Sequence, residues 1–356
     1  LSRGDNAPQK TRFTQIDILK GLAIISVVLI HTYNNTLLLS IGAPFTIWQA
    51  VPVFLLLAAF NNAYALSSAH KVTLLQSFDL TIIYRRLKRL AGPYLIVWIF
   101  QLLVVLLFLA FQMPFSFQDP NYFFYNGINW FFNLLSGASG PGHYFVPVIF
   151  QLILFVPLLY YLARRSPNLM LVVAFVLDLA LESVSVLSGM PTWLYGILFI
   201  RFIFICGLGV WLVFQERVMT GWILFGGLLS VVYIAATSYL NFQIWIFSLD
   251  PSFFHAFSFF WPLVIVVLGF QYLPSDSRNP VVRILAELGK ASWHIFLVQM
   301  TFFFLFSQMT RSIPMIVAIG PIIFLAVFFL VPCLSIGYGF YRIQEYLIKP
   351  KKSSIR

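Results

Sequence analysis

The stretch IDILKGLAIISVVLIHTYNN, residues 16–35, decides the fold, because it is a membrane-length apolar helix with polar side chains along one face. Lys20 and His31 are eleven residues apart, or three helical turns plus about 20°, so we expect them on one face, about 16 Å apart along the axis. Three more polar residues extend this stripe by about one turn at its ends: Asp17, Asn34 and Asn35. Such a stripe is costly in lipid, so it must face protein or water.

Composition indicates an all-α polytopic membrane protein. The 356 residues are 60% hydrophobic and 9% charged, with a mean hydropathy of +0.90. Apolar runs of about 20 residues, long enough to cross a bilayer, recur along the whole chain. We expect about ten transmembrane helices, over residues 16–38, 45–67, 90–113, 143–163, 169–187, 193–214, 221–240, 251–273, 291–310 and 313–340. The aromatic connection 114–142 is expected to lie at the interface or to re-enter the membrane.

Positive charge predicts how these helices are oriented. With a cytoplasmic N-terminus, every Lys and Arg except Arg201 and Arg311 falls in segments on the cytoplasmic side or at its boundary. This bias favours two cytoplasmic termini and an even number of helices. The net charge of +11 then follows from topology and from anionic lipid, and it requires no nucleic-acid partner. We expect a multi-pass protein of the cell membrane, that is, of a plasma or inner membrane.

The domain organisation is simple. Residues 1–340 are expected to form a single transmembrane domain, and residues 341–356 a short basic cytoplasmic tail, with no linker leading to a further module. Cys206 and Cys333 are isolated in predicted helices and are expected to pack in the core, and no metal site is predicted. The sequence leaves the oligomeric state open and is compatible with a homo-oligomer.

His31 is the first candidate for chemistry. An ionisable residue near the middle of a membrane helix indicates function, and the ordinary pKa of histidine suits it to take a proton from a hydroxyl nucleophile. The alternative is a buried histidine that hydrogen-bonds across helices. Lys20 is either part of the same site or an interfacial lysine paired with Asp17.

The second candidate is the basic run TIIYRRLKRLAGPYL, residues 81–95. Arg86 and Arg89 are one turn apart just before a predicted span, where two guanidinium groups can grip phosphates. Two further cations accompany them: Arg85 and Lys88. The alternative is a positive anchor that touches lipid head groups. Pro93 is compatible with the start of the following helix.

The remaining polar candidates lie in later spans. Asp178 and Glu182 share a helix face, and Arg201 lies midway along the next predicted span, so we expect Arg201 to face the bundle. Either it pairs internally with one of these carboxylates or it contacts a substrate. On the outer side, an acceptor sugar could stack near the aromatic segment and the helix that follows it, with three candidate residues: Trp130, His143 and Tyr144.

Several motifs together resemble the acyltransferase-3 family of integral membrane acyltransferases. The run D-x-L-K-G-L-A…H, with Lys20 and His31, resembles the family's first-helix signature, and the R-x-x-R of Arg86 and Arg89 resembles its basic motif. GHYFVPVIFQLILFVPLLYYL (142–162) is similar to its fourth-helix region, and GKASWHIFLVQ (289–299) to its late G-K-x-S segment. Two positions depart from the pattern: Lys20 replaces a common Arg, and Gln299 replaces a common His, so no proton-transfer role is assigned there.

The resemblance implies transfer of an acyl group, usually acetyl from acetyl-CoA, to a hydroxyl of a cell-surface sugar, polysaccharide or lipid-linked acceptor. It implies that the basic run binds the donor's phosphates and that His31 is the general base, or a transient acyl carrier, with Lys20 near the donor and Asp17 orienting Lys20. Asn34 and Asn35, beside His31, would contact the acceptor. Two other classes remain open: a transporter or flippase for a sugar or polysaccharide intermediate, and a scaffold subunit of an envelope-synthesis complex.

Overall fold

The computed structural model describes residues 13–111, 127–215, 221–249, 252–276, 278–311 and 322–348. These residues form α-helices, short 3₁₀ helices and connections, and they contain no β-strand. The α-helices are α1 (Thr14–Thr32), α2 (Asn35–Ser40), α3 (Ala50–Ser68), α4 (Leu74–Ser77), α5 (Leu80–Ala110), α6 (Gly127–Ser136), α7 (Phe145–Arg165), α8 (Pro167–Leu187), α9 (Thr192–Gly196), α10 (Ile203–Leu212), α11 (Gly221–Tyr239), α12 (Phe260–Tyr272), α13 (Pro280–Lys290), α14 (Ser292–Arg311) and α15 (Ile322–Ile348). The 3₁₀ helices are η1 (Ala43–Phe45), η2 (Ile47–Gln49), η3 (Phe199–Phe202), η4 (Trp245–Phe247), η5 (Ser252–Phe254) and η6 (Ala256–Ser258).

The multi-pass helical class is confirmed. Seven helical segments within the described residues are long and apolar enough to cross a membrane: Thr14–Thr32, Ala43–Ser68, Leu74–Phe108, Phe145–Arg165, Pro167–Leu187, Gly221–Tyr239 and Phe324–Leu347. Three shorter apolar helices coincide with the other expected spans: Phe199–Leu212, Ala256–Tyr272 and Ser292–Phe306. Helices suit this environment because each satisfies its own backbone hydrogen bonds without water. The count of ten and the cytoplasmic termini stay predictions.

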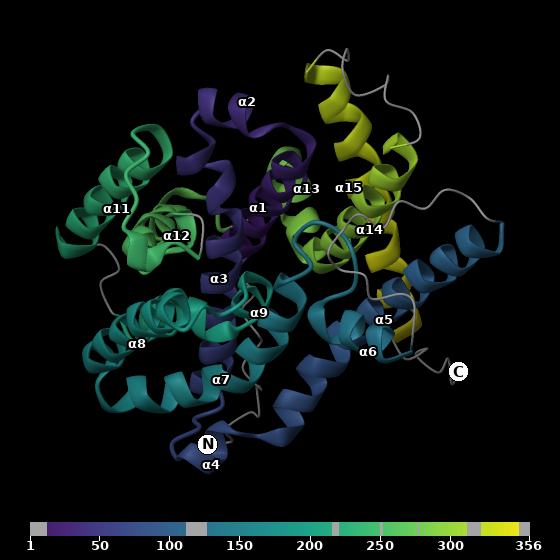
Figure 1. Cartoon of the computed structure of the whole chain (residues 1–356). Helices are drawn as coiled ribbons and strands as arrows, with labels where there is room; N and C mark the ends of the chain where they lie inside the picture. The colour runs from purple at the N-terminus through teal and green to yellow at the C-terminus, as the bar shows by residue number, and fades with distance from the viewer. Residues whose placement is uncertain are drawn as a thin grey trace, which may run out of the picture.

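Helix α1 lies in the interior of the bundle. Figure 1 shows it surrounded by other helices, and α3, α12, α13, α14 and α15 all contact it. The contact with α13 is the tightest kind, backbone against backbone. A β-carbon on Gly21 would lie 2.1 Å from the carbonyl oxygen of Leu285, and one on Gly289 would lie 1.7 Å from that of Asp17. Glycine is therefore required at both positions, and the crossing holds the Asp17 end of α1 against α13.

The first predicted span, 16–38, is corrected by the structure. Helix α1 ends at Thr32, Tyr33 and Asn34 are extended, and α2 begins at Asn35. The physical reason is an N-cap, because Asn34 Oδ1 accepts a hydrogen bond of 2.9 Å from the backbone N–H of Leu37. The prediction that Asn34 and Asn35 continue the polar stripe of α1 is therefore wrong, because both lie beyond the end of that helix.

Other boundaries also differ. The helix that contains the basic run begins at Leu80, so Pro93 lies inside α5 and does not start it. The predicted span 193–214 is divided into α9, η3 and α10. In the connection 114–142, residues 127–136 form α6, and the rest of its aromatic run lies outside the described residues, as does the start of span 313–340.

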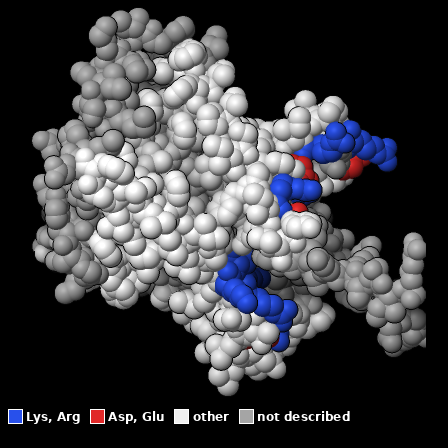
Figure 2. Space-filling model, turned by 90° about the vertical axis from the view of Figure 1, so that its right-hand side faces the viewer, with Lys and Arg blue, Asp and Glu red and all other residues white. Residues whose placement is uncertain are grey.

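The interior has a polar component. Asp17, Asp178, Glu182 and Arg201 are all buried, which confirms that Arg201 faces the bundle. Cys206 and Cys333 are buried and reduced, as expected for core residues. On the face displayed in Figure 2, Lys and Arg gather toward one side and the rest of the described surface is largely uncharged, in keeping with the bias along the sequence.

Candidate active site

A cavity of about 520 Å³ lies where the end of α1 meets the start of α7, the end of α11 and the segment before α12. Apolar and aromatic side chains form most of its wall, Val27, Leu39 and Phe296 among them. Its polar lining residues are His31, Asn35, Tyr144, Tyr233, Thr237, Ser238, Gln243, Ser248 and His255. A mostly apolar cavity with a few convergent polar groups is the usual form of a small-molecule site.

His31 occupies the last turn of α1 and lines this cavity. Its ring meets that of Phe303 edge to face, with centroids 5.9 Å apart. Within the described part of the chain, no hydrogen bond holds either ring nitrogen of His31.

Gly142 lies beside His31, and the sequence reasoning did not select it. A β-carbon on Gly142 would lie 3.8 Å from His31 Nε2 and 3.3 Å from the ring of Phe296. The φ of Gly142 is +83°, a conformation that glycine adopts without strain. The chain thus passes beside the imidazole at a residue whose backbone conformation favours glycine. A glycine-rich connection before a span, GASGPG (137–142), is the sequence signal for such an approach.

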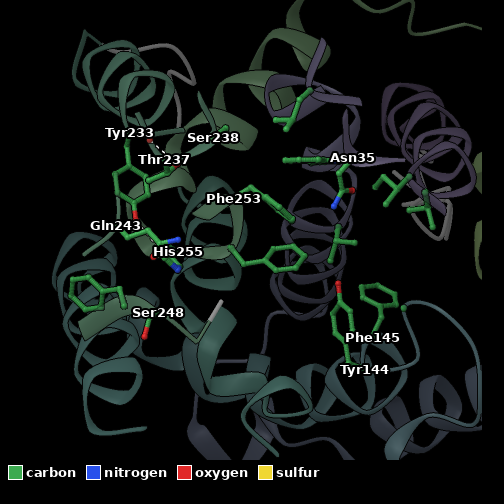
Figure 3. Close-up of a pocket in the computed structure, with 18 of the residues that line it drawn as sticks. Asn35, Tyr144, Phe145, Tyr233, Thr237, Ser238, Gln243, Ser248, Phe253 and His255 are labelled. Carbon is green, nitrogen blue, oxygen red and sulfur yellow. Dashed lines mark hydrogen bonds between the residues drawn. The ribbon is translucent and has the colours of Figure 1, made fainter. Parts of the chain in front are cut away.

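The candidate acceptor-contact residues separate into two groups. Asn35 and Tyr144 line the cavity, and Figure 3 shows both at one side of it. Asn34 instead caps α2. His143 is not among the residues that line the described cavity, and its Nδ1 lies 3.2 Å from the carbonyl oxygen of Gly140 in its own turn. Trp130 also lies outside the lining and packs against the cluster of Val105 and Phe304.

Arg201 lies just behind the cavity wall. Its exposed fraction is 4%, and its guanidinium carbon is 4.4 Å from the ring centroid of Phe202 and 5.3 Å from those of Tyr144 and Phe254. Since Tyr144 and Phe254 line the cavity, Arg201 supports the wall through cation–π contacts. Its guanidinium also donates to the carbonyl oxygen of Gly196 at 3.2 Å. The predicted ion pair with Asp178 or Glu182 stays a prediction.

His255 is the residue that sequence reasoning missed. Its exposed fraction is 5%, and it lines the cavity. Its Nε2 lies 3.3 Å from Glu182 Oε1, and its Nδ1 lies 2.5 Å from the hydroxyl of Tyr233. The available signal was the carboxylate of Glu182 inside a predicted span, because a buried charge requires a partner from another helix.

The other predicted site residues lie toward the opposite end of α1. Asp17 is buried and Lys20 is half-buried, and neither lines the cavity in the described structure. In the first turns of α5, Arg86 is half-buried, and the other three cations are exposed: Arg85, Lys88 and Arg89. The structure therefore does not bring these cations to His31 directly.

Helix α14 connects the two regions. The indole N–H of Trp293 donates to the carbonyl oxygen of Leu90, in the turn that follows Arg89, at 3.2 Å. The Trp293 ring stacks on that of Phe296, with centroids 5.8 Å apart, and Phe296 lines the cavity next to Gly142. Since Trp293 and Phe296 differ by one helical turn, the basic start of α5 and the cavity are separated by a short run of packed side chains.

The comparison with protein families decides the classification. The family model Acyl_transf_3, described as an acyltransferase domain, matches residues 13–339, nearly the whole chain. The chain belongs to the acyltransferase-3 family. No curated protein and no solved structure matches it. The matched region contains α1, the basic start of α5 and the cavity, so this acyltransferase-3 protein has its candidate groups within the family domain.

Among the described residues there is no group of three or more His, Cys, Asp and Glu that could hold a metal ion. An acyltransferase site needs a base near the nucleophile and space for two substrates. His31 and the cavity beside it provide that combination.

Proposed function

We propose that this acyltransferase-3 protein is a membrane O-acyltransferase that moves an acyl group, usually acetyl, from acyl-CoA to a hydroxyl of a sugar, polysaccharide or lipid-linked acceptor. His31 takes the proton from the acceptor hydroxyl, and the oxygen attacks the thioester carbonyl. The carbon–sulfur bond breaks, and the departing CoA thiolate takes the proton back from the imidazolium. The products are an ester and free CoA, and no metal takes part in any step.

The observation that carries this proposal is the position of His31. Its Nε2 faces the close approach at Gly142, and its ring lines a cavity large enough for a monosaccharide-sized group. A general base must come within hydrogen-bond reach of the proton that it takes, and an acceptor hydroxyl in this cavity meets that requirement. Asn35 and Tyr144 are the nearby hydrogen-bonding groups proposed to contact the acyl acceptor.

The donor is proposed to bind from the basic side. Arg86 and Arg89, with the accompanying cations Arg85 and Lys88, contact the phosphates of the nucleotide part, and Lys20 contacts the arm that carries the thioester. The packing of Leu90, Trp293 and Phe296 supports this, since it links the basic turn to the cavity within about one turn of α14. Asp17 orients Lys20 in this proposal.

The same proposal includes the membrane location and the topology of the protein. Residues 1–340 form a single transmembrane domain in the plasma or inner membrane, with both termini and the tail 341–356 in the cytoplasm, where acyl-CoA is made. Arg201 contributes to acceptor binding indirectly, by supporting the rings of Tyr144 and Phe254. A transporter or scaffold role is not proposed, because the family match concerns an acyltransferase domain.

The test is donor turnover by the purified protein. The protein in detergent or nanodiscs receives acetyl-CoA and a panel of acceptors, namely methyl glycosides and a lipid extract of the source membrane. We expect release of free CoA, measured with a thiol reagent, and formation of an acetyl ester, measured by mass spectrometry. A protein that binds sugars but releases no CoA above the background hydrolysis rate would be a transporter or a scaffold.

A further inference from the structure

Three polar side chains lie in a row at the cavity, on the side away from Asn35 and Tyr144, with Tyr233 and His255 in its wall and Glu182 behind them. Tyr233 comes from α11, His255 from the turn between η5 and η6, and Glu182 from α8. The Tyr233 hydroxyl lies 2.5 Å from His255 Nδ1, and His255 Nε2 lies 3.3 Å from Glu182 Oε1. Figure 3 shows Tyr233 and His255 together at this wall, and both line the cavity.

The chemistry of the three groups indicates which group donates in the hydrogen bond between Tyr233 and His255. His255 Nε2 lies 3.3 Å from the Glu182 carboxylate, and a proton on Nε2 is favoured beside that acceptor, which leaves Nδ1 as an acceptor. The Tyr233 hydroxyl then donates a hydrogen bond to Nδ1. The phenolic oxygen keeps its lone pairs, and these can accept a hydrogen bond from a molecule in the cavity.

The burial of Glu182 and His255 indicates a role beyond packing. Glu182 has an exposed fraction of 1% and His255 of 5%. Removing such groups from water is costly, and apolar side chains of the same volume would stabilise the bundle at least as well. A buried carboxylate and imidazole that end on a hydroxyl in a cavity are arranged to hold that hydroxyl in one orientation.

We propose that Tyr233 binds a hydroxyl group of the acyl acceptor, a polyhydroxylated sugar ring, and that His255 and Glu182 are positioning residues that orient the Tyr233 hydroxyl. This inference rests on the proposed function, and it assigns the acceptor's binding contact on the wall away from Asn35. His31 acts on the reacting hydroxyl, and Tyr233 holds a different hydroxyl of the same ring.

The rest of this wall suits a sugar. Phe253 projects into the space between the two sides in Figure 3 and packs on Trp48 with ring centroids 5.0 Å apart, so it presents an apolar surface to the C–H face of a ring. Thr237 and Gln243 lie on the same side as Tyr233 and add hydrogen-bonding groups. An apolar surface bordered by hydroxyl and amide groups matches a molecule with one C–H face and a rim of hydroxyls.

The first test separates acceptor binding from chemistry. We expect Tyr233→Phe to raise the KM for the acyl acceptor about 3- to 10-fold, the value of one hydrogen bond, while kcat and the KM for acetyl-CoA stay within about twofold. The matched control is Tyr160→Phe, which also removes one hydroxyl from a buried tyrosine, but there the hydroxyl donates to the carbonyl oxygen of Lys71 away from the cavity. An unchanged acceptor KM, or an equal rise in the control, would overturn the proposal.

The second test does not need turnover. Binding of methyl β-D-glucopyranoside, methyl α-D-mannopyranoside and methyl α-L-rhamnopyranoside to the protein in nanodiscs is measured by saturation-transfer NMR. We expect at least one glycoside to bind, and Tyr233→Phe to weaken it by the same factor. No binding of any glycoside, or equal binding to the variant, contradicts the inference. If the glycosides bind with this dependence and no CoA is released, the proposed function fails while the sugar site stands.

The positioning role of His255 is tested by the glycoside affinity of its variants. His255→Gln keeps one donor and one acceptor, so we expect it to retain much of the glycoside affinity, whereas His255→Leu should lose as much as Tyr233→Phe. In the double variant Tyr233→Phe with His255→Leu, the two losses should not add, because both act through one hydroxyl. Additive losses would show that His255 acts independently of Tyr233.

Discussion

Helix α1 meets its neighbours in opposite ways at its two ends. At Asp17 and Gly21 its backbone lies against α13, with no space even for a β-carbon on either side of the crossing. At His31 the same helix borders a cavity of about 520 Å³. The first end fixes the position of the helix, and the second end presents a reactive side chain to open space.

The Asp17 end and the His31 end of α1 are expected to control different properties of the protein. Because α1 is a continuous helix from Thr14 to Thr32, an anchor at its Asp17 end also fixes where His31 lies. Substitutions near the anchor should therefore lower stability, whereas substitutions near the cavity should lower turnover in a folded protein. Four measurements test this difference between the two ends of α1 and the regions around them.

The largest effect is expected at the cavity end. His31→Gln should reduce acyl transfer by about 10²–10⁴-fold, because glutamine can hydrogen-bond but cannot take a proton at neutral pH. The melting temperature and the calorimetric affinity for acetyl-CoA should stay unchanged. The control is His70→Asn, at an exposed position with φ of +50°, which asparagine tolerates. Near-normal turnover in His31→Gln would make His31 a structural residue.

The next effect concerns the basic start of α5. Replacing Arg86 and Arg89 together by Gln should raise the KM for acetyl-CoA about 10- to 100-fold, because two charge-assisted contacts to phosphate are lost. The acceptor KM and the melting temperature should not change. Replacement of Arg164 and Arg165 by Gln removes the same charge from the end of α7 and serves as the control. An equal change in both pairs would mean that these cations serve topology alone.

A smaller effect, on stability alone, is expected at the anchored end. Gly289→Ala should destabilise the folded protein by about 1–3 kcal/mol, since its methyl group would overlap the carbonyl oxygen of Asp17 and push α1 from α13. The matched control is Gly339→Ala, a helical glycine in α15 with nothing within 4 Å of the added carbon. The melting temperature should fall for Gly289→Ala only. An equal result for both variants would contradict the anchor.

The smallest effect is a pH dependence on α13. Burial tends to raise the pKa of Glu287, but the hydrogen bond from Lys290 at 2.6 Å, the hydroxyl of Tyr338 and the charge of Arg342 outweigh it and hold that pKa below its usual value of 4.5. A lowered folded-state pKa stabilises the protein above the unfolded value, and this contribution is lost as the pH falls below about 4.5. The gap in melting temperature between wild type and Glu287→Gln should therefore narrow as the pH falls from 6 to below 4. A constant gap would contradict this role.

Much of the site could be anticipated from local sequence. His31 was identified because a titratable residue in a long apolar run is conspicuous without any knowledge of packing. Tyr144 was identified for a similar reason, as an aromatic residue at the start of a span. Asn34 was misassigned because the search followed helical periodicity, whereas an asparagine can also end one helix and cap the next.

The sequence by itself determined that this chain forms apolar helices that cross a membrane, because hydropathy adds up along a segment and needs no tertiary contact. The family is likewise a property of the sequence, since the family model matches residues 13–339. Tertiary packing alone brings Tyr233 and His255 to one cavity, with Glu182 beside His255, and places Gly142 beside His31. These residues come from separate segments, and no periodicity relates them, so only the packing of helices brings them together.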